Sequence, residues 1–298
     1  MVVVFPGSDE PALTRANVLA AGSPVAAACA TPDSISFTVE SRCRGLDQRS
    51  LATGRQLLIV SNWSEAGYRP DILRALMPLP EARRRFASQV AALADSAGRG
   101  GIVLDFRALG PRDVDALVAL VTAVADSARG RNVAPVIMVV PAADTAAYPG
   151  RHLGAVTDLL AVRLELEPAS PGPSAPRNRM SRLVGARAAE IGAHRVMLLI
   201  PADGFMWRGG EPRSRVSFEQ AVATARDWGV DFVRDESSAT LRARAPGRGE
   251  IWVNDAVLIA GIVRDARRLG IRKFALYGLG GEDTAIWSAI AAEPAVTR

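Results

Sequence analysis

Two charged residues end a short apolar run, Gly100–Arg107, in the first half of the chain. Alternation along an extended strand divides this run into two faces. One face holds Ile102, Leu104 and Phe106, and the other holds Val103, Asp105 and Arg107. We expect the second face to point into the fold, where a charged pair is costly unless its members neutralise each other or meet a ligand. The pattern therefore predicts either an ion pair or a ligand-binding position at Asp105 and Arg107.

A second run of alternating charges, Val162-Arg-Leu-Glu-Leu-Glu167, follows later in the chain. Its alternation turns Arg163, Glu165 and Glu167 inward and leaves the leucines and the valine outward. Two glutamates on one face could act as an acid and a base. They lie about 7 Å apart along one strand, however, and one strand cannot supply the opposed geometry that glycoside hydrolysis needs.

Metal-ligating residue types are scarce. His152 and His194 are the two histidines and have no evident third partner, so neither a zinc site nor a Ser-His-Asp triad is predicted. Cys29 and Cys43 have no metal-ligand spacing, although they could form one disulfide. We expect no metal and no cofactor.

Composition narrows the class of protein. The 298 residues are 49% hydrophobic and 22% charged, in the range of globular proteins and unlike disordered chains. The net charge is +5. The basic residues, all arginine except Lys273, are dispersed along the chain, so nucleic acid is not an expected partner. No apolar run reaches the about 18 to 20 residues of a membrane-spanning helix. The first residues also lack the basic start and the length of a signal peptide.

Strands and helices must alternate to position these residues. Eight apolar, β-branched runs predict strands: Val2–Phe5, Val25–Ala30, Leu57–Trp63, Ile102–Phe106, Pro135–Val140, Leu159–Leu164, Val196–Ile200 and Phe274–Leu279. Amphipathic segments predict helices at Glu81–Ala97, Arg112–Arg129, Met180–Ile191, Ser217–Trp228, Ala256–Leu269 and Thr284–Ala292. Eight such units favour a (β/α)₈ barrel, an α/β fold that we expect to span residues 1–298 as one domain.

Two further features refine this architecture. Residues 203–255, between the seventh and eighth strands, are too long for a loop and predict an α+β insertion at the barrel mouth. A dinucleotide-binding sheet is the alternative, but Gly7-Ser8-Asp9 after the first strand lacks the glycine spacing that seats a pyrophosphate. Function in a (β/α)₈ barrel is expected at the carboxyl ends of the strands.

Several segments resemble glycoside hydrolase family 18, in its branch of spore-cortex glucosaminidases and chitinase-like domains. Gly101–Asp113 resembles the family's fourth-strand motif, and Leu57–Trp63 is similar to its third strand. Ile200–Trp207 is similar to the end of the seventh strand, and Glu250–Asp255 to a later segment of the family. Leu276–Trp287 carries the most specific likeness, to the closing Trp-x-Leu-Gly-x-Glu-Asp-Pro-x-x-Trp pattern. The order of these segments implies the (β/α)₈ fold over nearly the whole chain.

The resemblance also implies what the chemistry would require. The family hydrolyses GlcNAc polymers with a glutamic acid after Asp-x as proton donor, while the acetamido group of the substrate attacks the anomeric carbon. Arg107 holds the donor position and has no proton to give at working pH. A glutamate, Glu165, stands where the family has a tyrosine on the sixth strand, and Tyr277 replaces a tryptophan on the eighth.

We therefore expect a family 18-like barrel without hydrolytic activity that binds a GlcNAc-containing polysaccharide, such as a chitin-like or peptidoglycan-type glycan. The expected binding residues are Asn62, Trp63, Asp105, Arg107, Glu165, Asp203, Trp207, Tyr277 and Glu282. Aromatic faces would stack on sugar rings, while the polar groups would give direction. The resemblance implies a secreted or cell-envelope location. Asn62-Trp-Ser64 also matches a glycosylation acceptor.

Two alternatives stay open. One is an active glycosidase that uses a displaced carboxylate of Glu165, Glu167 or Glu282. The other is a structural or interaction domain whose mouth is filled by its own charges, with Asp105, Arg107, Arg163 and Glu165 pairing among themselves.

Overall fold

The computed structural model describes residues 2–6, 25–33, 36, 39–41, 56–64, 67–96, 100–166, 168–209 and 211–293. Cys43 and Glu167 lie outside these ranges, as do residues 7–9, which argued against a dinucleotide-binding sheet, and the last five residues. Cys29 is described only as part of a strand backbone, so the proposed disulfide falls outside the described residues.

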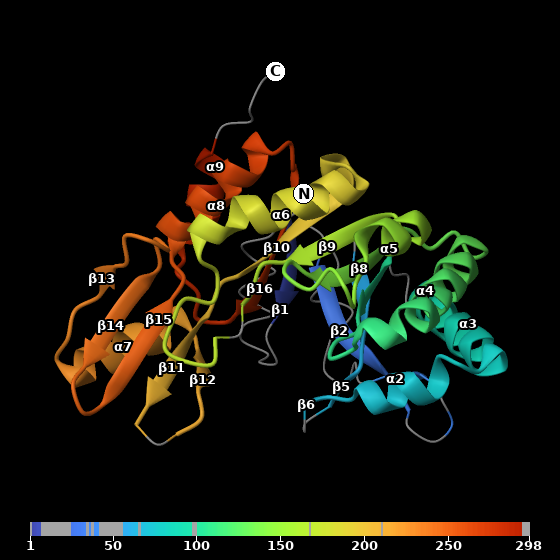
Figure 1. Ribbon diagram of the computed structural model, residues 1–298, viewed down its shortest axis with the longest axis horizontal. Coiled ribbons are helices and arrows are strands. Elements are labelled where there is room, and N and C mark those ends of the chain that lie inside the picture. The colour runs from blue at the N-terminus through green and yellow to red at the C-terminus, as the bar shows by residue number, and fades with distance from the viewer. Residues whose placement is uncertain are drawn as a thin grey trace.

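Eight parallel strands form a closed barrel, as the alternating runs predict (Figure 1). In chain order they are β1 (Val2–Pro6), β2 (Val25–Pro32), β4 (Gln56–Ser61), β7 (Ile102–Asp105), β8 (Val136–Pro141), β9 (Leu159–Arg163), β10 (Val196–Pro201) and β16 (Lys273–Leu279). Each strand pairs with the next, β16 pairs with β1, and β1 pairs with β2 through Val4 and Val25. A short strand, β3 (Val39–Ser41), pairs antiparallel with the end of β2.

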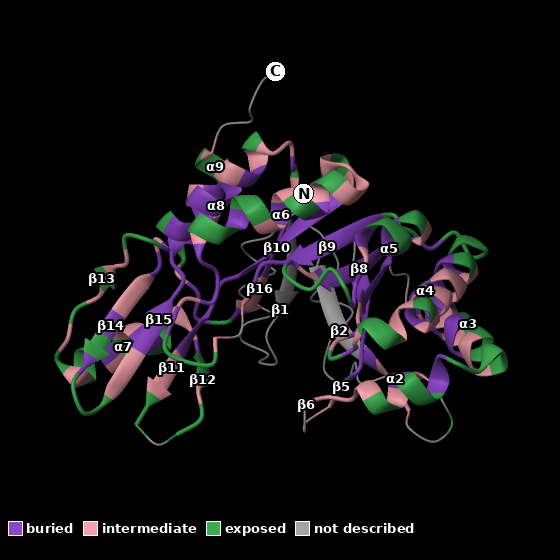
Figure 2. Cartoon of the chain, in the orientation of Figure 1, coloured by how far each residue is buried: buried purple, intermediate pink, exposed green. Residues whose placement is uncertain are grey.

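Helices cover the outside of the barrel. They are α2 (Pro70–Leu76), α3 (Pro80–Ser96), α4 (Val114–Arg129), α5 (Gly150–Val156), α6 (Arg177–Ile191), α8 (Ala256–Arg268) and α9 (Ala285–Ala292), with 3₁₀ turns at Pro111–Asp113 and Ala193–Arg195. Figure 2 shows strands β8, β9 and β10 buried and the outward faces of α3, α4 and α6 exposed. The apolar stripe of each helix thus packs on the sheet.

Period-two alternation separates two cores on the two faces of the strands. Ile102, Leu104 and Phe106 belong to the large core between strands and helices. Val103 belongs to a smaller core that fills the barrel interior together with Leu57, Ile59, Ile137, Val139 and Met197. The predicted faces of this strand are confirmed.

The predicted α+β insertion follows β10. It contains an antiparallel sheet of β11 (Gly204–Arg208), β12 (Ser214–Val216), β13 (Val233–Arg234), β14 (Leu241–Ala245) and β15 (Gly249–Val253), with helix α7 (Phe218–Trp228). One face of the sheet packs on α7 through a separate small core that includes Ala221, Ile251 and Val253. Ser217 and Gln220 form a capping box that starts α7.

The third strand is shorter than predicted. β4 ends at Ser61 rather than continuing to Trp63, because the Trp63 amide donates to the Ser61 hydroxyl and the chain turns into a separate hairpin. This hairpin pairs β5 (Trp63–Ser64) with β6 (Gly67–Tyr68). In the described part of the chain, no helix combines the length and the apolar character needed to span a bilayer.

Candidate functional site

The mouth, defined here as the carboxyl ends of the barrel strands and the loops after them, holds the Asp105–Arg107 pair. Arg107 Nε and Nη2 donate to the two oxygens of Asp105 at 2.8 and 2.9 Å. Burial lowers the pKa of the Arg107 guanidinium, but the charge of Asp105 and the hydrogen bonds to it outweigh burial and leave that pKa above its ordinary value. Arg107 therefore stays a cation and cannot act as a proton donor.

Asn62 fixes the position of Arg107 through the backbone. Its amide nitrogen donates to the Arg107 carbonyl at 3.0 Å, and its amide oxygen accepts from the Arg107 N–H at 2.9 Å. Asn62 is buried, and both ends of its side chain have protein partners. The structure thus gives Asn62 a positioning contact, whereas the sequence predicted a hydrogen bond to a ligand.

The β5–β6 hairpin brings an aromatic pair to the same place. The Tyr68 ring lies under the Arg107 guanidinium at 4.7 Å, and Trp63 meets it edge-on at 4.9 Å between centroids. Trp63 is 51% exposed, so it offers a ring face to a ligand. Sequence reasoning missed Tyr68, since its only local signal is an aromatic residue in an irregular segment.

A second charged cluster crosses from the barrel to the insertion. Arg163 Nη1 donates to Glu165 at 2.9 Å, and Arg215 of β12 donates both to Glu165 and, at 2.6 Å, to Asp203. The side chains of Glu165 and Asp203 are 0% and 9% exposed, whereas that of Arg215 is 45% exposed. One half-exposed guanidinium therefore covers two buried carboxylates. Sequence reasoning missed Arg215, which lies 50 residues from Glu165.

Tyr277 joins this second cluster. It packs against the barrel interior, and its hydroxyl is buried with no hydrogen-bond partner among the described residues. Burial raises the pKa of Tyr277 well above its ordinary value, and the charge of Glu165 adds to the rise. The charges of Arg163 and Glu165 also act on Tyr68 across the mouth, so the two clusters are neighbours.

The other predicted binding residues lie differently. Trp207, on β11 of the insertion, is partly buried and meets Phe205 edge-on at 5.9 Å. Glu282 is buried and accepts from the Gly280 N–H at 2.9 Å, within the loop that follows β16. Among the described residues no group of acids, histidines or cysteines is arranged to hold a metal ion.

The Asp203 carboxyl group at the mouth has a raised pKa. Burial raises its pKa to about 6, the charge of Arg215 opposes the rise, and the charge of Glu165 adds to it. The carboxyl group fits closely against β16 because position 278 is glycine. A Cβ there would lie 2.5 Å from the Asp203 Cγ, and Gly278 also has a φ of +70°.

This pKa predicts a pH-dependent stability difference between the wild type and Asp203→Asn. An unfolded aspartate has a pKa of about 4, so folding favours the protonated form. The wild type should lose about 2 to 3 kcal/mol of unfolding free energy relative to the variant as pH rises from about 4 to above 6. Urea unfolding of both proteins at several pH values measures the difference. A difference that does not change with pH would contradict the assigned pKa.

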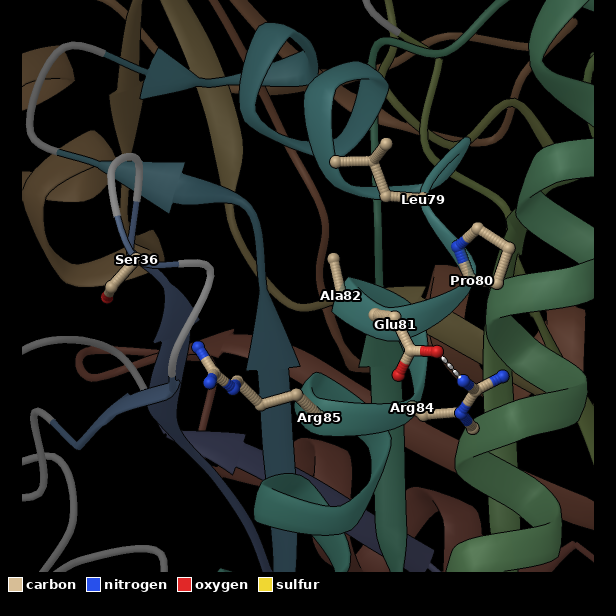
Figure 3. Close-up of a pocket in the computed structure, with 7 residues that line it drawn as sticks. All are labelled: Ser36, Leu79, Pro80, Glu81, Ala82, Arg84 and Arg85. Carbon is tan, nitrogen blue, oxygen red and sulfur yellow. Dashed lines mark hydrogen bonds and ion pairs between the residues drawn. The ribbon is translucent and has the colours of Figure 1, made fainter.

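A separate pocket of about 660 Å³ lies beside the start of α3. Figure 3 shows Leu79, Pro80 and Ala82 on one side, Ser36 opposite, and Arg85 extending between them. Glu81 and Arg84 form an exposed ion pair with each other. Exposed ion pairs of this kind contribute little to the stability of the fold. None of the predicted site residues lines this pocket.

Comparison with known sequences gives one distant relative. No protein-family profile matches the chain. The candidate sporulation-specific glycosylase YdhD of Bacillus subtilis is 22% identical over 215 residues, which cover 67% of this chain and 51% of that protein. The chain therefore spans about half the length of the curated relative that it matches.

Solved structures share the fold over almost the whole chain. A chitinase from Chromobacterium violaceum superposes with a TM-score of 0.87 at 21% identity, covering 100% of this chain and 99% of that one. The spore cortex-lytic enzyme SleL of Bacillus megaterium gives 0.86 at 16% identity, covering 98% and 73%. A chitinase of glycoside hydrolase family 18 from Cycas revoluta, in complex with (GlcNAc)₄, gives 0.78 at 18% identity, covering 98% of each chain. The chain therefore has the (β/α)₈ fold of family 18 glycoside hydrolases.

Proposed function

We propose that this chain is a saccharide-binding barrel that does not hydrolyse its ligand. The observation that carries the proposal is the Asp105–Arg107 ion pair: the position that resembles the proton donor of family 18 holds a guanidinium bonded to the preceding aspartate. Acid catalysis needs a group that can lose a proton near working pH, and arginine does not. The scaffold is retained while its acid is lost.

Binding is supported by the surroundings of this pair. Trp63 presents an exposed ring beside Tyr68 and Arg107 at the mouth. Aromatic faces with a few directional polar groups are the usual composition of saccharide sites. A double mutant of the Cycas revoluta chitinase binds (GlcNAc)₄ on the same fold, so a GlcNAc-containing glycan is the ligand class that we propose here.

Calorimetric titration with GlcNAc oligomers, together with an assay for released ends, tests the proposal. We expect saturable binding without turnover. Glu165→Gln and Glu282→Gln test the alternative of a displaced catalytic carboxylate: any turnover that one of them abolishes would replace our proposal by that alternative.

Trp63→Ala should weaken binding of a GlcNAc hexamer about tenfold, equivalent to about 1.4 kcal/mol, because the variant loses the exposed stacking face. The exposed side chain makes a large loss of stability unexpected. Val233→Ala is the matched control, since Val233 is 68% exposed on β13, at the far edge of the insertion sheet. Equal affinity of the Trp63 variant and the control would remove Trp63 from the site.

A second candidate function is a structural or interaction domain. The observation that favours it is the pairing of Asp105 with Arg107 and of Glu165 with Arg163 and Arg215, which neutralises these acids without a ligand. The same titration distinguishes the two candidates. Absence of binding to every GlcNAc oligomer and to the corresponding glucosamine oligomers would favour the structural domain.

A further inference from the structure

The carboxylates of Glu165 and Asp203 share one cation, the guanidinium of Arg215. Both side chains are almost fully buried at the ends of adjacent strands, β9 and β10. Their oxygens converge on two nitrogens of one guanidinium, that of Arg215. Two buried carboxylates that share one site repel each other unless a cation lies between them or one of them takes up a proton. At pH 7, above the pKa of Asp203, the cation is the stabilising partner.

Arg215 is the most exposed member of this cluster, although it also lies over the Phe205 ring at 5.1 Å. It belongs to β12, a strand of three residues at the edge of the insertion sheet, paired on one side only. Figure 1 shows β12 on the side of the insertion nearest to β6 of the barrel mouth. Its side chain is 45% exposed, unlike the acids beneath it, so Arg215 can be replaced from the solvent side.

The barrel offers more hydrogen-bonding capacity here than Arg215 uses. Oδ1 of Asp203 and the hydroxyl of Tyr277 are both buried, and neither has a hydrogen-bond partner within the described residues. Buried polar groups without partners are costly, so they mark a place where a ligand group gains by binding. An N–H donor could bond Asp203 Oδ1 in addition to the atoms that Arg215 already contacts.

The charges of the cluster determine which kind of sugar can replace Arg215. Among the described residues, Arg163 pairs with Glu165, and Arg215 pairs with both Glu165 and Asp203. A neutral sugar that displaced Arg215 would leave one buried carboxylate uncompensated, and an anionic sugar would add a further negative charge. A ligand cation that takes the place of Arg215 leaves the net charge of the cluster unchanged.

We propose that the mouth binds an amino sugar with a free amine, whose ammonium group replaces the Arg215 guanidinium between Glu165 and Asp203. This inference rests on the proposed saccharide binding and specifies its ligand: a glucosamine-type unit in preference to its N-acetylated form.

Titration at pH 7 with two hexamers, of glucosamine and of GlcNAc, tests the selectivity, since the two ligands differ only in their acetyl groups. The wild type should bind the glucosamine hexamer at least tenfold more tightly. Glu165→Gln should bring the two affinities close to each other, because it removes one of the two charges that hold the ammonium. Arg242→Met is the matched control: Arg242 bonds Glu250 within the insertion, and its loss should leave the ratio unchanged.

Arg215→Met provides an independent measurement. Without its guanidinium the two carboxylates lose their cation, so the melting temperature should fall. The glucosamine hexamer should reverse more of this fall in melting temperature than the GlcNAc hexamer does, because only the amine replaces the missing charge. Equal rescue by the two hexamers would overturn the assignment of the ammonium to this site.

The affinity for the ligand should depend on pH through the protonation of Asp203. Asp203 lies near Arg215 of β12, Glu165 just after β9, and Tyr277 of β16. Arg163, the last residue of β9, pairs with Glu165. Because the pKa of Asp203 is about 6, affinity for the glucosamine hexamer should fall below that pH as the carboxylate is protonated, while affinity for the GlcNAc hexamer stays level.

The outcomes separate this inference from the proposed function. Equal or tighter binding of the GlcNAc hexamer by the wild type overturns the amine selectivity and leaves saccharide binding in place. Binding of neither hexamer overturns both. A ratio that Glu165→Gln does not change would show that the preference arises elsewhere in the mouth.

Discussion

Replacing Arg187 with methionine is expected to lower the free energy of unfolding by about 3 to 5 kcal/mol, because three backbone carbonyls would lose the same buried donor. Arg187 is fully buried on α6, where its Nη1 donates to the Tyr148 carbonyl at 2.6 Å and its Nη2 donates to the Pro141 and Asp144 carbonyls at 2.7 Å. Glu190 accepts a longer bond at 3.3 Å. The variant would leave these acceptors unpaired in the interior.

The same network reaches the mouth. Residues 142–149 form the loop after β8, and the Tyr148 hydroxyl in this loop accepts from the Leu109 N–H in the loop after β7. Loss of Arg187 should therefore weaken ligand binding as well as stability. Urea unfolding measures the first effect, with Arg182→Met, an exposed change on the same helix, as the control expected to stay within about 0.5 kcal/mol of wild type. Similar values for the two variants would contradict the anchoring role.

Arg107→Glu is expected to produce no measurable hydrolysis of GlcNAc oligomers, although it places a carboxyl group at the position that resembles the family's proton donor. A working general acid is commonly worth about 10² to 10⁴ in rate. Groups that act as a unit are strongly non-additive, however, and Glu165 replaces the tyrosine that the resemblance places on the sixth strand. Turnover by Arg107→Glu alone would show that the remaining machinery is intact.

The variant should also lose stability. A carboxylate at position 107 would stand beside Asp105 without the guanidinium, so the pKa of one of the two carboxyl groups would rise. Arg107→Gln removes the cation without adding a negative charge. Comparing its stability with that of Arg107→Glu therefore separates the loss of the ion pair from the repulsion between the two carboxylates. The double variant Arg107→Glu with Glu165→Tyr tests whether the two positions act together, and any hydrolysis should require both changes.

The sequence by itself determined the barrel and the inward faces of its strands. Alternation is a local property with a period of two residues, so Val103 and Ile102 could be assigned to opposite faces from the chain alone, and the structure confirms both. The Asp105–Arg107 pair was also predictable, because the partners are two residues apart on one strand. Residues 203–255 are too many for a loop between two barrel strands, so the insertion was also predictable from the sequence.

Tertiary structure decided which charges meet across the mouth. Arg215 reaches Glu165 and Asp203 only because the insertion sheet places β12 beside the ends of β9 and β10. Asn62 was predicted to face a ligand but bonds the Arg107 backbone, and Tyr68 reaches Arg107 through a hairpin that the strand pattern had not indicated. Periodicity tells which face a side chain occupies. Its partner on that face depends on how distant segments pack, and no local pattern in the chain encodes that.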